Sequence, residues 1–305
     1  MIESKRTREA VLDRGIGCLV GLAIGDALGA TLEFKTRDQH PPVTDLVGGG
    51  TFNLKPGEWT DDTSMALCLA DSIIESNGLN SKDLMERFIR WRDDGENSPT
   101  GYCIDVGGTI TDAINRFLRT GNPESGPVHE YAAGNGSIMR LAPVALRWHN
   151  DPEAARRHAR AQSRTTHGAP QAVEASALLA DILVDAIKTG DKAFTLRPRD
   201  LDIRGLSRIA QGDWRTKQRA DIKSSGYVVD TLEAALWSVY SSDNFAGAVI
   251  LAANLGGDAD TVGAVTGQIA GALWGLSGIP SAWLEKLAWR DRIEDRARRL
   301  MAAAS

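Results

Sequence analysis

The stretch "GCLVGLAIGDALG", residues 17–29, places a glycine at every fourth position, and "GAVTGQIAGALWG", residues 263–275, repeats this spacing near the other end of the chain. Each glycine costs a helix about 1 kcal/mol relative to alanine, so a compensating interaction is needed. Glycines four apart lie along one helix face and let another backbone approach closely. We therefore predict that both segments are central helices in tight packing. Asp26 and the sequence around Asp258 would then lie at the ends or edges of this pair.

The remainder of the chain shows mostly helical periodicity. In residues 172–188 the charged positions fall on one stripe of an otherwise apolar helix. Further helices are predicted for residues 64–75, 81–92, 109–118, 152–162, 229–240, 244–253, 261–274 and 281–301. Only "TFNLKPGEW", residues 51–59, is a candidate strand. The predicted class is all-α, as one domain over residues 1–305, with residues 197–226 as an exposed insertion of loops or short helices.

Composition limits the range of functions. The 305 residues are 42% hydrophobic with a formal net charge of -5, which fits a globular protein with a sizeable core. The most basic stretch, "RDRIEDRARRL", interleaves acids with bases and predicts a solvated helix face. Nucleic acid is therefore not an expected partner.

The cysteines and the N-terminus bear on location. Cys18, Cys68 and Cys103 form no C-x-x-C pair and are expected to be reduced, as in a cytoplasmic protein. The N-terminus imitates a signal peptide, but Asp13 and Asp26 interrupt its apolar run, which is shorter than the roughly 18–20 residues that span a bilayer. We expect a cytoplasmic protein without membrane insertion, and a monomer is one open possibility for its oligomeric state.

Two acidic motifs carry the chemistry: "WTDDTS" at residues 59–64 and "GGDADT" at residues 256–261. Carboxylate and hydroxyl oxygens are the ligands of magnesium and manganese. Asp61 and Asp62 would project differently from a helix start, whereas Asp258 and Asp260 would point the same way from an extended turn. The glycine pair before Asp258 would leave room for an ion or a phosphate. The competing interpretation is that these acids cap the helices that follow them.

Other segments give weaker signals. "GNGSIMR", residues 134–140, could cradle a phosphate with its backbone amides at a helix start. His167, in "TTHGAP", precedes a predicted helix, so a role in the turn is favoured over a role in a site. Asp105 and Tyr227 give no functional signal by themselves. The sequence contains neither an EF-hand loop nor a zinc signature.

Six blocks together resemble a known family. "GLAIGDALGATLEF", "WTDDTSMALCLADSI", "GNGSIMRLAPVAL", "TTHGAP", "SGYVVDTLEAALW" and "LGGDADTVGAVTGQIAGALWG" occur in the order and approximate spacing of ADP-ribosylglycohydrolases. The resemblance covers Gly17 to Leu287 and is greatest to the bacterial dinitrogenase reductase-activating glycohydrolase branch.

This resemblance implies a compact orthogonal bundle of helices around two Mg²⁺ or Mn²⁺ ions, and hydrolysis of the bond between ADP-ribose and an acceptor side chain. The matched metal ligands are Thr60, Asp61, Asp62, Asp258, Asp260 and Thr261. The matched catalytic acids are Glu33 and Asp105, and our mechanism adds Asp61 or Asp258 as the group that holds the proton of the attacking water. The matched diphosphate loop comprises Asn135, Gly136, Ser137 and Met139, while His167 and Tyr227 match positions lining the ADP-ribose cleft.

One departure bears on the substrate. The block expected to be "DVGNT" is "DVGGT", so Gly108 stands where the nitrogenase-linked branch has asparagine. The expected partner is an ADP-ribosylated protein, modified on arginine. The open alternatives are serine-linked or oligomeric ADP-ribose, a small ADP-ribosylated metabolite, or an immunity protein that binds an ADP-ribosylating toxin.

Overall fold

The computed structural model describes residues 2–303, and within this range the secondary structure is helical, with two isolated bridges and no extended strand. The first helices are α1 (Ile2–Gly29), α2 (Asp61–Glu75), α3 (Ser81–Asp94), α4 (Gly108–Thr120), α5 (Ala142–Arg147), α6 (Pro152–Thr166) and α7 (Pro170–Thr189). They are followed by α8 (Lys192–Thr195), α9 (Leu206–Gln211), α10 (Val228–Tyr240), α11 (Phe245–Ala253), α12 (Ala259–Trp274), α13 (Ser281–Lys286) and α14 (Arg290–Ala302). The all-α prediction is confirmed.

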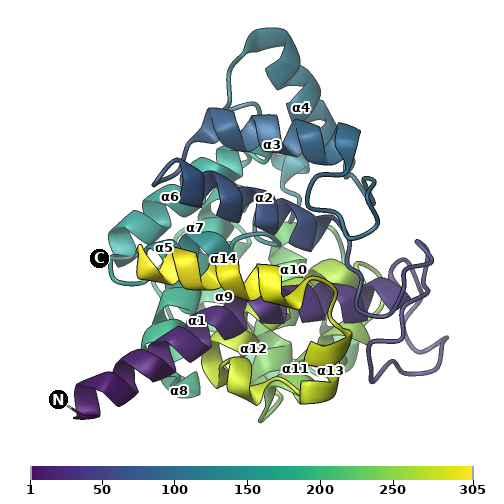
Figure 1. Cartoon of the computed structure of the whole chain (residues 1–305). Helices are drawn as coiled ribbons and strands as arrows, with labels where there is room; N and C mark the ends of the chain where they lie inside the picture. Colours follow the sequence, from purple (N-terminus) through teal and green to yellow (C-terminus); the bar gives the residue numbers. More distant parts are fainter. Residues whose placement is uncertain (1, 304–305) are drawn as a thin grey trace.

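Helices α1 and α12 are in close contact at the centre of the fold (Figure 1). They run antiparallel, because glycines that come later in α1 face glycines that come earlier in α12. A Cβ added to Gly21 would lie 2.3 Å from the carbonyl oxygen of Gly267, and one added to Gly25 would lie 2.0 Å from that of Gly263. No side chain fits at such distances, so the two rows of glycines bring the backbones together. The predicted pairing of these segments is confirmed.

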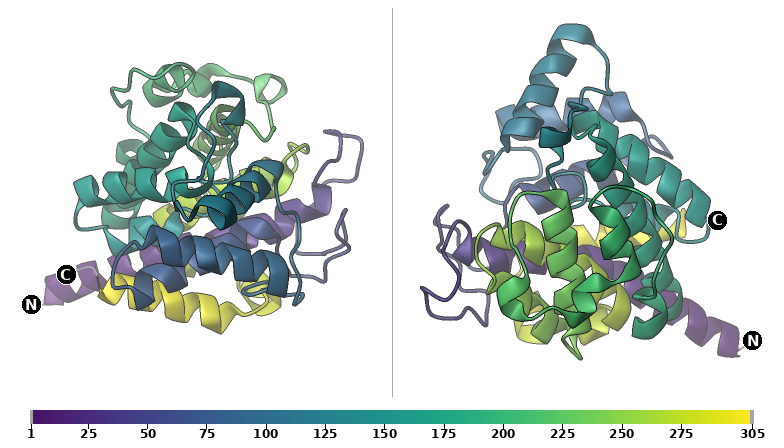
Figure 2. Two further views of the ribbon diagram at one scale, coloured as in Figure 1. Left: turned by 90° about the horizontal axis from the view of Figure 1, so that it is seen from above. Right: turned by 180° about the vertical axis from the view of Figure 1, so that it is seen from behind.

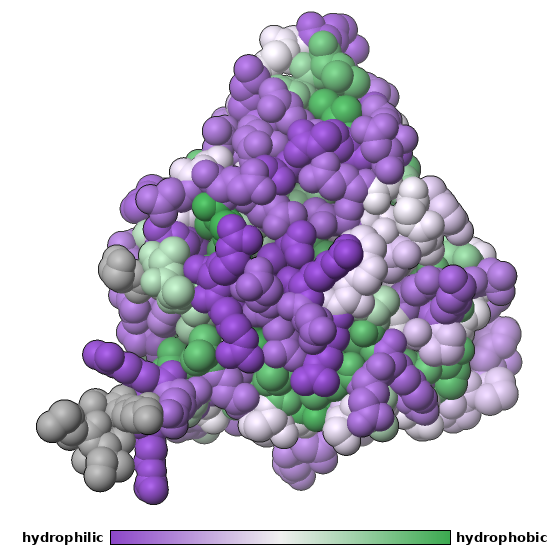
Figure 3. Space-filling view, viewed as in Figure 1, coloured by the Kyte–Doolittle hydropathy of each residue, from purple (hydrophilic) through white to green (hydrophobic). Residues whose placement is uncertain are grey.

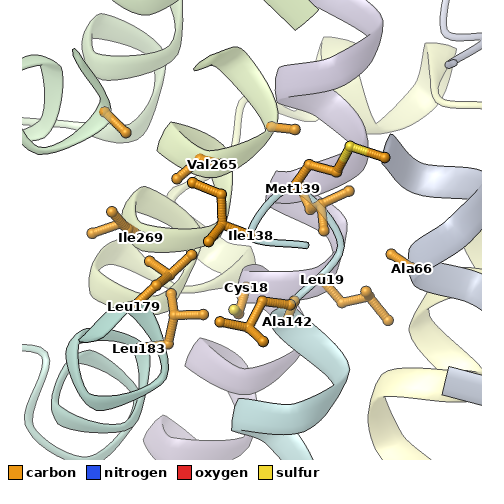
Figure 4. Close-up of a cluster of buried hydrophobic side chains, with 14 of the residues drawn as sticks. Cys18, Leu19, Ala66, Ile138, Met139, Ala142, Leu179, Leu183, Val265 and Ile269 are labelled. Carbon is orange, nitrogen blue, oxygen red and sulfur yellow. The ribbon is translucent and has the colours of Figure 1, made fainter. Parts of the chain in front are cut away.

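Other helices cover the central pair and complete the core (Figure 2). In Figure 4, Leu19 of α1, Leu179 of α7 and Ile269 of α12 surround a segment that begins at Ile138 and leads into α5. All four of these side chains are fully buried. Burial of apolar surface stabilises this arrangement by about 25 cal/mol per Å², and it fixes the 134–140 loop against the central helices.

Helix α1 is long and apolar enough, by length and composition, to cross a membrane, which differs from the short run expected from the sequence. However, 94% of its most apolar window is buried inside the protein. The face shown in Figure 3 is mainly hydrophilic, with scattered hydrophobic patches. The apolar length of α1 is accounted for by its central position in the core.

Two sequence predictions fail in detail. The segment predicted as one helix over residues 281–301 is two, because Trp289 adopts a left-handed conformation (φ 51°) and packs its ring edge-on against Trp59. The candidate strand at residues 51–59 forms turns, with a single bridge between Gly49 and Leu54. Pro56 and Gly57 favour this irregular path.

The predicted insertion at residues 197–226 is less exposed than expected. It contains α9 and short 3-10 turns, and it buries Trp214 and Ile222 against the rest of the protein. Arg37, which follows α1, donates to the carbonyl oxygens of Arg219 and Ile222 at 2.7 and 2.6 Å. These contacts hold the loop at residues 223–227 beside the C-terminal end of α1 and the start of α12.

Candidate metal centre and cleft

The two acidic motifs meet in space, although about 200 residues separate them in the chain. Asp260 is common to three groups of acids, and within each group one carboxylate oxygen per residue lies within 4.8 Å of the others. These groups are Asp26, Asp62 and Asp260; Glu33, Asp258 and Asp260; and Asp61, Asp105 and Asp260. The predicted convergence of carboxylates from both motifs is therefore confirmed.

Neither helix is capped at its N-cap position by an acid of its own motif, although Asp260 Oδ1 accepts the N–H of the next residue, Thr261, within the first turn of α12. Thr60 and Asp258 occupy the N-cap positions of α2 and α12, and neither side chain accepts a capping hydrogen bond. Asp26 accepts the backbone N–H of Thr63 in α2 at 3.0 Å, and Glu33 accepts that of Ala259 in α12 at 2.7 Å. Because α1 and the segment after it supply the caps, the capping interpretation of Asp61 and Asp62 is wrong.

The electrostatics of this cluster call for a cation. Asp61, Asp62 and Asp260 are buried, and burial, with neighbouring carboxylates, raises the pKa of each well above its ordinary value. No ion pair among residues 2–303 involves any acid of the three groups. Asp62 Oδ1 is buried without a hydrogen-bond partner. Divalent cations would supply both the missing charge and the missing partner, so the residues fit a metal centre.

The local geometry of "GGDADT" differs from the extended turn expected. Helix α12 begins at Ala259, so Asp260 lies in its first turn and Asp258 precedes it. Gly256 and Gly257 have φ of 65° and 66°, and a Cβ on Gly257 would lie 2.2 Å from the carbonyl oxygen of Ser224. These glycines permit a left-handed turn against other backbone, rather than leaving room for an ion or a phosphate.

Glu33 and Asp105, which the family match assigns to catalysis, both lie beside the acidic motifs. Burial raises the pKa of Glu33 to about 7, and burial and Asp258 raise the pKa of Asp105 to about 6. Asp105 adopts φ 55°, a conformation that is uncommon for a residue with a side chain and is often found at functional sites.

A cavity of about 500 Å³ opens above the acids, a volume typical of small-molecule sites. Its lining includes Glu33, Asp61, Asp105, Asp258 and Thr261, while Thr60, Asp62 and Asp260 are buried beneath it. A second cavity of about 680 Å³ shares Thr109, Gly134 and Gly226 with the first. The two form one cleft that extends away from the acids.

The 134–140 loop divides its roles differently from the family match. Gly136 and Met139 line the first cavity, whereas Ser137 is fully buried and pairs with Ser176 at 3.1 Å. Asn135 also lines the cavity, but its side-chain amide donates to Asp258 Oδ2 at 2.8 Å. The Ser137 side chain therefore does not line the cavity, although the family match includes this residue in the diphosphate loop, and Asn135 orients an acid.

His167 lines the first cavity and is held by a buried chain of hydrogen bonds. Thr166 Oγ1 accepts from Arg140 Nη2 at 2.8 Å and lies 2.9 Å from His167 Nδ1. We expect the hydroxyl to donate its proton to Nδ1, which would place the ring proton on Nε2. Tyr227 is further out: it lines the second cavity with Tyr131 and accepts a hydrogen bond from Gln171.

His167 is expected to stay neutral throughout the physiological range. Burial and the nearby Arg140 charge lower its pKa to about 3, because both disfavour a second positive charge. Nitrogen-15 NMR of the imidazole should show an Nε2-protonated ring without titration between about pH 5 and 8, a range that contains the ordinary histidine pKa. A titration midpoint near 6.5 would contradict this assignment.

Sequence reasoning gave no site role to three residues that shape this region. The sequence predicts that Asp26 lies at the edge of the helix pair, but no local pattern predicts that it caps α2. Arg140 is a fully buried cation that holds Gln162 and Thr166. Phe34 is 63% exposed at the cavity with φ 62°. Of these three residues, Asp26 is the one that the sequence could have indicated. It is an acid within a helix predicted to be buried, and a buried charge requires partners.

The fold and the site define an all-helical protein with a buried carboxylate centre, suited to metal ions, at the floor of an open cleft. Comparison with known proteins agrees with this class: residues 7–305 match the family model described as ADP-ribosylglycohydrolase. The chain belongs to the ADP-ribosylglycohydrolase family.

Individual relatives cover most of the chain. It is 48% identical over 299 residues to a Pseudomonas putida protein named ADP-ribosylarginine hydrolase Tri1, covering 98% of this chain and 80% of that protein. It is 36% identical to the Rhodospirillum rubrum ADP-ribosyl-[dinitrogen reductase] glycohydrolase, covering 92% of each. A solved structure titled ADP-ribosylglycohydrolase-related protein complex superposes with a TM-score of 0.87 at 40% identity, covering 97% of this chain and all of that one.

Proposed function

We propose that this protein hydrolyses the bond between ADP-ribose and an arginine side chain of a modified protein. The observation that carries the proposal is the meeting of both acidic motifs at Asp260, on the floor of a cleft. The choice of arginine is supported by the 48% identity to a relative named ADP-ribosylarginine hydrolase. We place the reaction in the cytoplasm, in keeping with three free cysteines.

The cofactors we propose are two Mg²⁺ or Mn²⁺ ions. Thr60, Asp61, Asp62, Asp258, Asp260 and Thr261 would hold them, with Glu33 and Asp105 alongside. Such ions, when bound, polarise ribose oxygens and lower the pKa of a coordinated water. The donor set consists of oxygen atoms alone, which favours hard cations over zinc or copper.

The protein's own groups would orient the substrate and handle its protons. Glu33 lines the cavity and is held at Oε2 by the Ala259 amide, so this acid would provide the proton that the departing guanidine requires. Asp258 is held by Asn135 and lines the cavity with Asp61, so either acid can accept the proton of the attacking water. His167 offers a neutral N–H donor toward the ligand.

Gly108 bears on the target protein. It lines the cavity, and a Cβ added there would meet no atom within 4 Å, so the cleft is wider than it would be with asparagine. This supports a modified protein other than dinitrogenase reductase. The chain is also more similar to ADP-ribosylarginine hydrolase Tri1, at 48% identity, than to the nitrogenase-linked glycohydrolase, at 36%, so the predicted greatest resemblance to the nitrogenase-linked branch is corrected.

The test compares arginine-ADP-ribosylated and serine-ADP-ribosylated proteins, each with EDTA, Mg²⁺ or Mn²⁺, and measures free ADP-ribose. We expect release from arginine only, dependent on added metal. Release from serine alone would transfer the proposal to the serine-linked alternative. Binding of an ADP-ribosylating toxin without any release, in protein that has bound Mn²⁺, would instead support an immunity role and overturn the hydrolase proposal.

A further inference from the structure

We propose that Asp26 is a positioning residue that turns the Thr60 hydroxyl into a metal ligand while binding no ion itself. This inference rests on the metal centre of the proposed function, but not on the choice of substrate. Asp26 lies on α1, between Gly25 and Gly29 of the glycine row, and its side chain is fully buried.

The Asp26 carboxylate already has all its acceptor positions filled. Oδ1 accepts from the amide and hydroxyl of Thr60 at 2.9 and 2.8 Å, and Oδ2 accepts from the amide and hydroxyl of Thr63 at 3.0 and 2.6 Å. An ionised carboxylate offers about four lone-pair positions, two on each oxygen. Asp26 therefore has none left for a cation, although it lies within 4.8 Å of Asp62 and Asp260 oxygens.

The Thr60 hydroxyl has one proton and three acidic neighbours. Its oxygen lies 2.8 Å from Asp26 Oδ1, 3.2 Å from Asp260 Oδ2 and 3.4 Å from Asp62 Oδ2. The shortest contact receives the proton, so the hydroxyl lone pairs face Asp62 and Asp260. When Asp62 and Asp260 are ionised, no proton lies between them and the hydroxyl oxygen. The three oxygens then repel one another, whereas a shared cation makes the same arrangement favourable. Asp26 thus sets the direction of the Thr60 hydroxyl.

Asp26 also fixes the position of one acidic motif relative to the other. Asp26 joins α1 to the start of α2, while the neighbouring Gly25 contacts Gly263 of α12. A shift of α2 would therefore move Asp61 and Asp62 relative to Asp260. Mutation of a group that orients a metal ligand without binding the metal typically lowers metal affinity about 10–100-fold.

Thr63 provides the sharpest test, because its hydroxyl donates to Asp26 Oδ2 and it is not among the six proposed metal ligands. Thr63→Val removes one hydrogen bond to Asp26 at nearly constant volume, and Thr63→Ser keeps it. Thr266→Val is the matched control, since its hydroxyl is equally buried and donates to Val262 within α12. Mn²⁺ affinity is measured by calorimetry and electron paramagnetic resonance without substrate, and folding by circular dichroism.

We expect Thr63→Val to weaken Mn²⁺ binding about 10–100-fold, with Thr63→Ser and Thr266→Val close to wild type. Folded Thr63→Val that binds Mn²⁺ as tightly as wild type would overturn the proposal. So would loss of binding in Asp26→Asn with wild-type binding in Thr63→Val, because Asp26 would then be a ligand itself. All these outcomes are independent of which ADP-ribosyl bond the enzyme cleaves.

Discussion

Asp260→Asn is expected to lower Mn²⁺ affinity by at least about 100-fold, the upper range for groups that only orient ligands, and to reduce ADP-ribose release to near background. Asp260 is the one acid common to all three candidate metal groups. Its Oδ1 accepts the N–H of Thr261 at 2.8 Å, a bond that asparagine can retain, so the start of α12 should be preserved. The loss would therefore reflect the missing negative charge rather than a disrupted helix.

The measurements are calorimetric titration with Mn²⁺, the release assay and circular dichroism. Asp71→Asn is the matched control, because Asp71 pairs with Arg296 at 2.7 Å in a group of charged residues that shares no acid with the metal groups. This control should lose some stability but bind Mn²⁺ normally. Unchanged Mn²⁺ binding by Asp260→Asn would remove the basis for the metal centre.

Gly21→Ala is expected to destabilise the fold by about 3 kcal/mol or more, the upper range for overpacking a core. The added methyl carbon would lie 2.3 Å from the Gly267 carbonyl oxygen and 3.0 Å from the Phe245 ring. Neither α1 nor α12 can move away to relieve this clash, because both are enclosed by other helices. Alanine is intrinsically the better helix former, so a loss of stability would isolate the packing effect.

Thermal and denaturant unfolding measure this effect. Gly247→Ala serves as the control within helix α11: its nearest contact would be Asn244 Oδ1 at an ordinary 3.4 Å, so stability should stay the same or rise by up to about 1 kcal/mol. If Gly21→Ala were as stable as wild type, the close approach of α1 and α12 would not be needed for the fold.

The sequence alone determined the parts of the protein that follow from local periodicity and side-chain chemistry. Glycine spacing predicted the central pair because only a residue without a side chain lets two helix backbones touch. Oxygen-bearing side chains in two motifs indicated hard cations, and six blocks matched one family over nearly the whole chain. Helix interiors were also predicted well, since their apolar stripes are intrinsic to the sequence.

Only the tertiary structure decided how these parts act together. In the structure, Ser137 is buried away from the cleft, and the last predicted helix is interrupted at Trp289. The backbone N–H groups at the starts of α2 and α12 are capped by Asp26 and Glu33. No local pattern could show this, because a cap from another segment depends on how helices pack rather than on neighbouring residues. That packing buries Asp62 and Asp260 without an ion-pair partner among residues 2–303, and this is the physical reason the site needs cations.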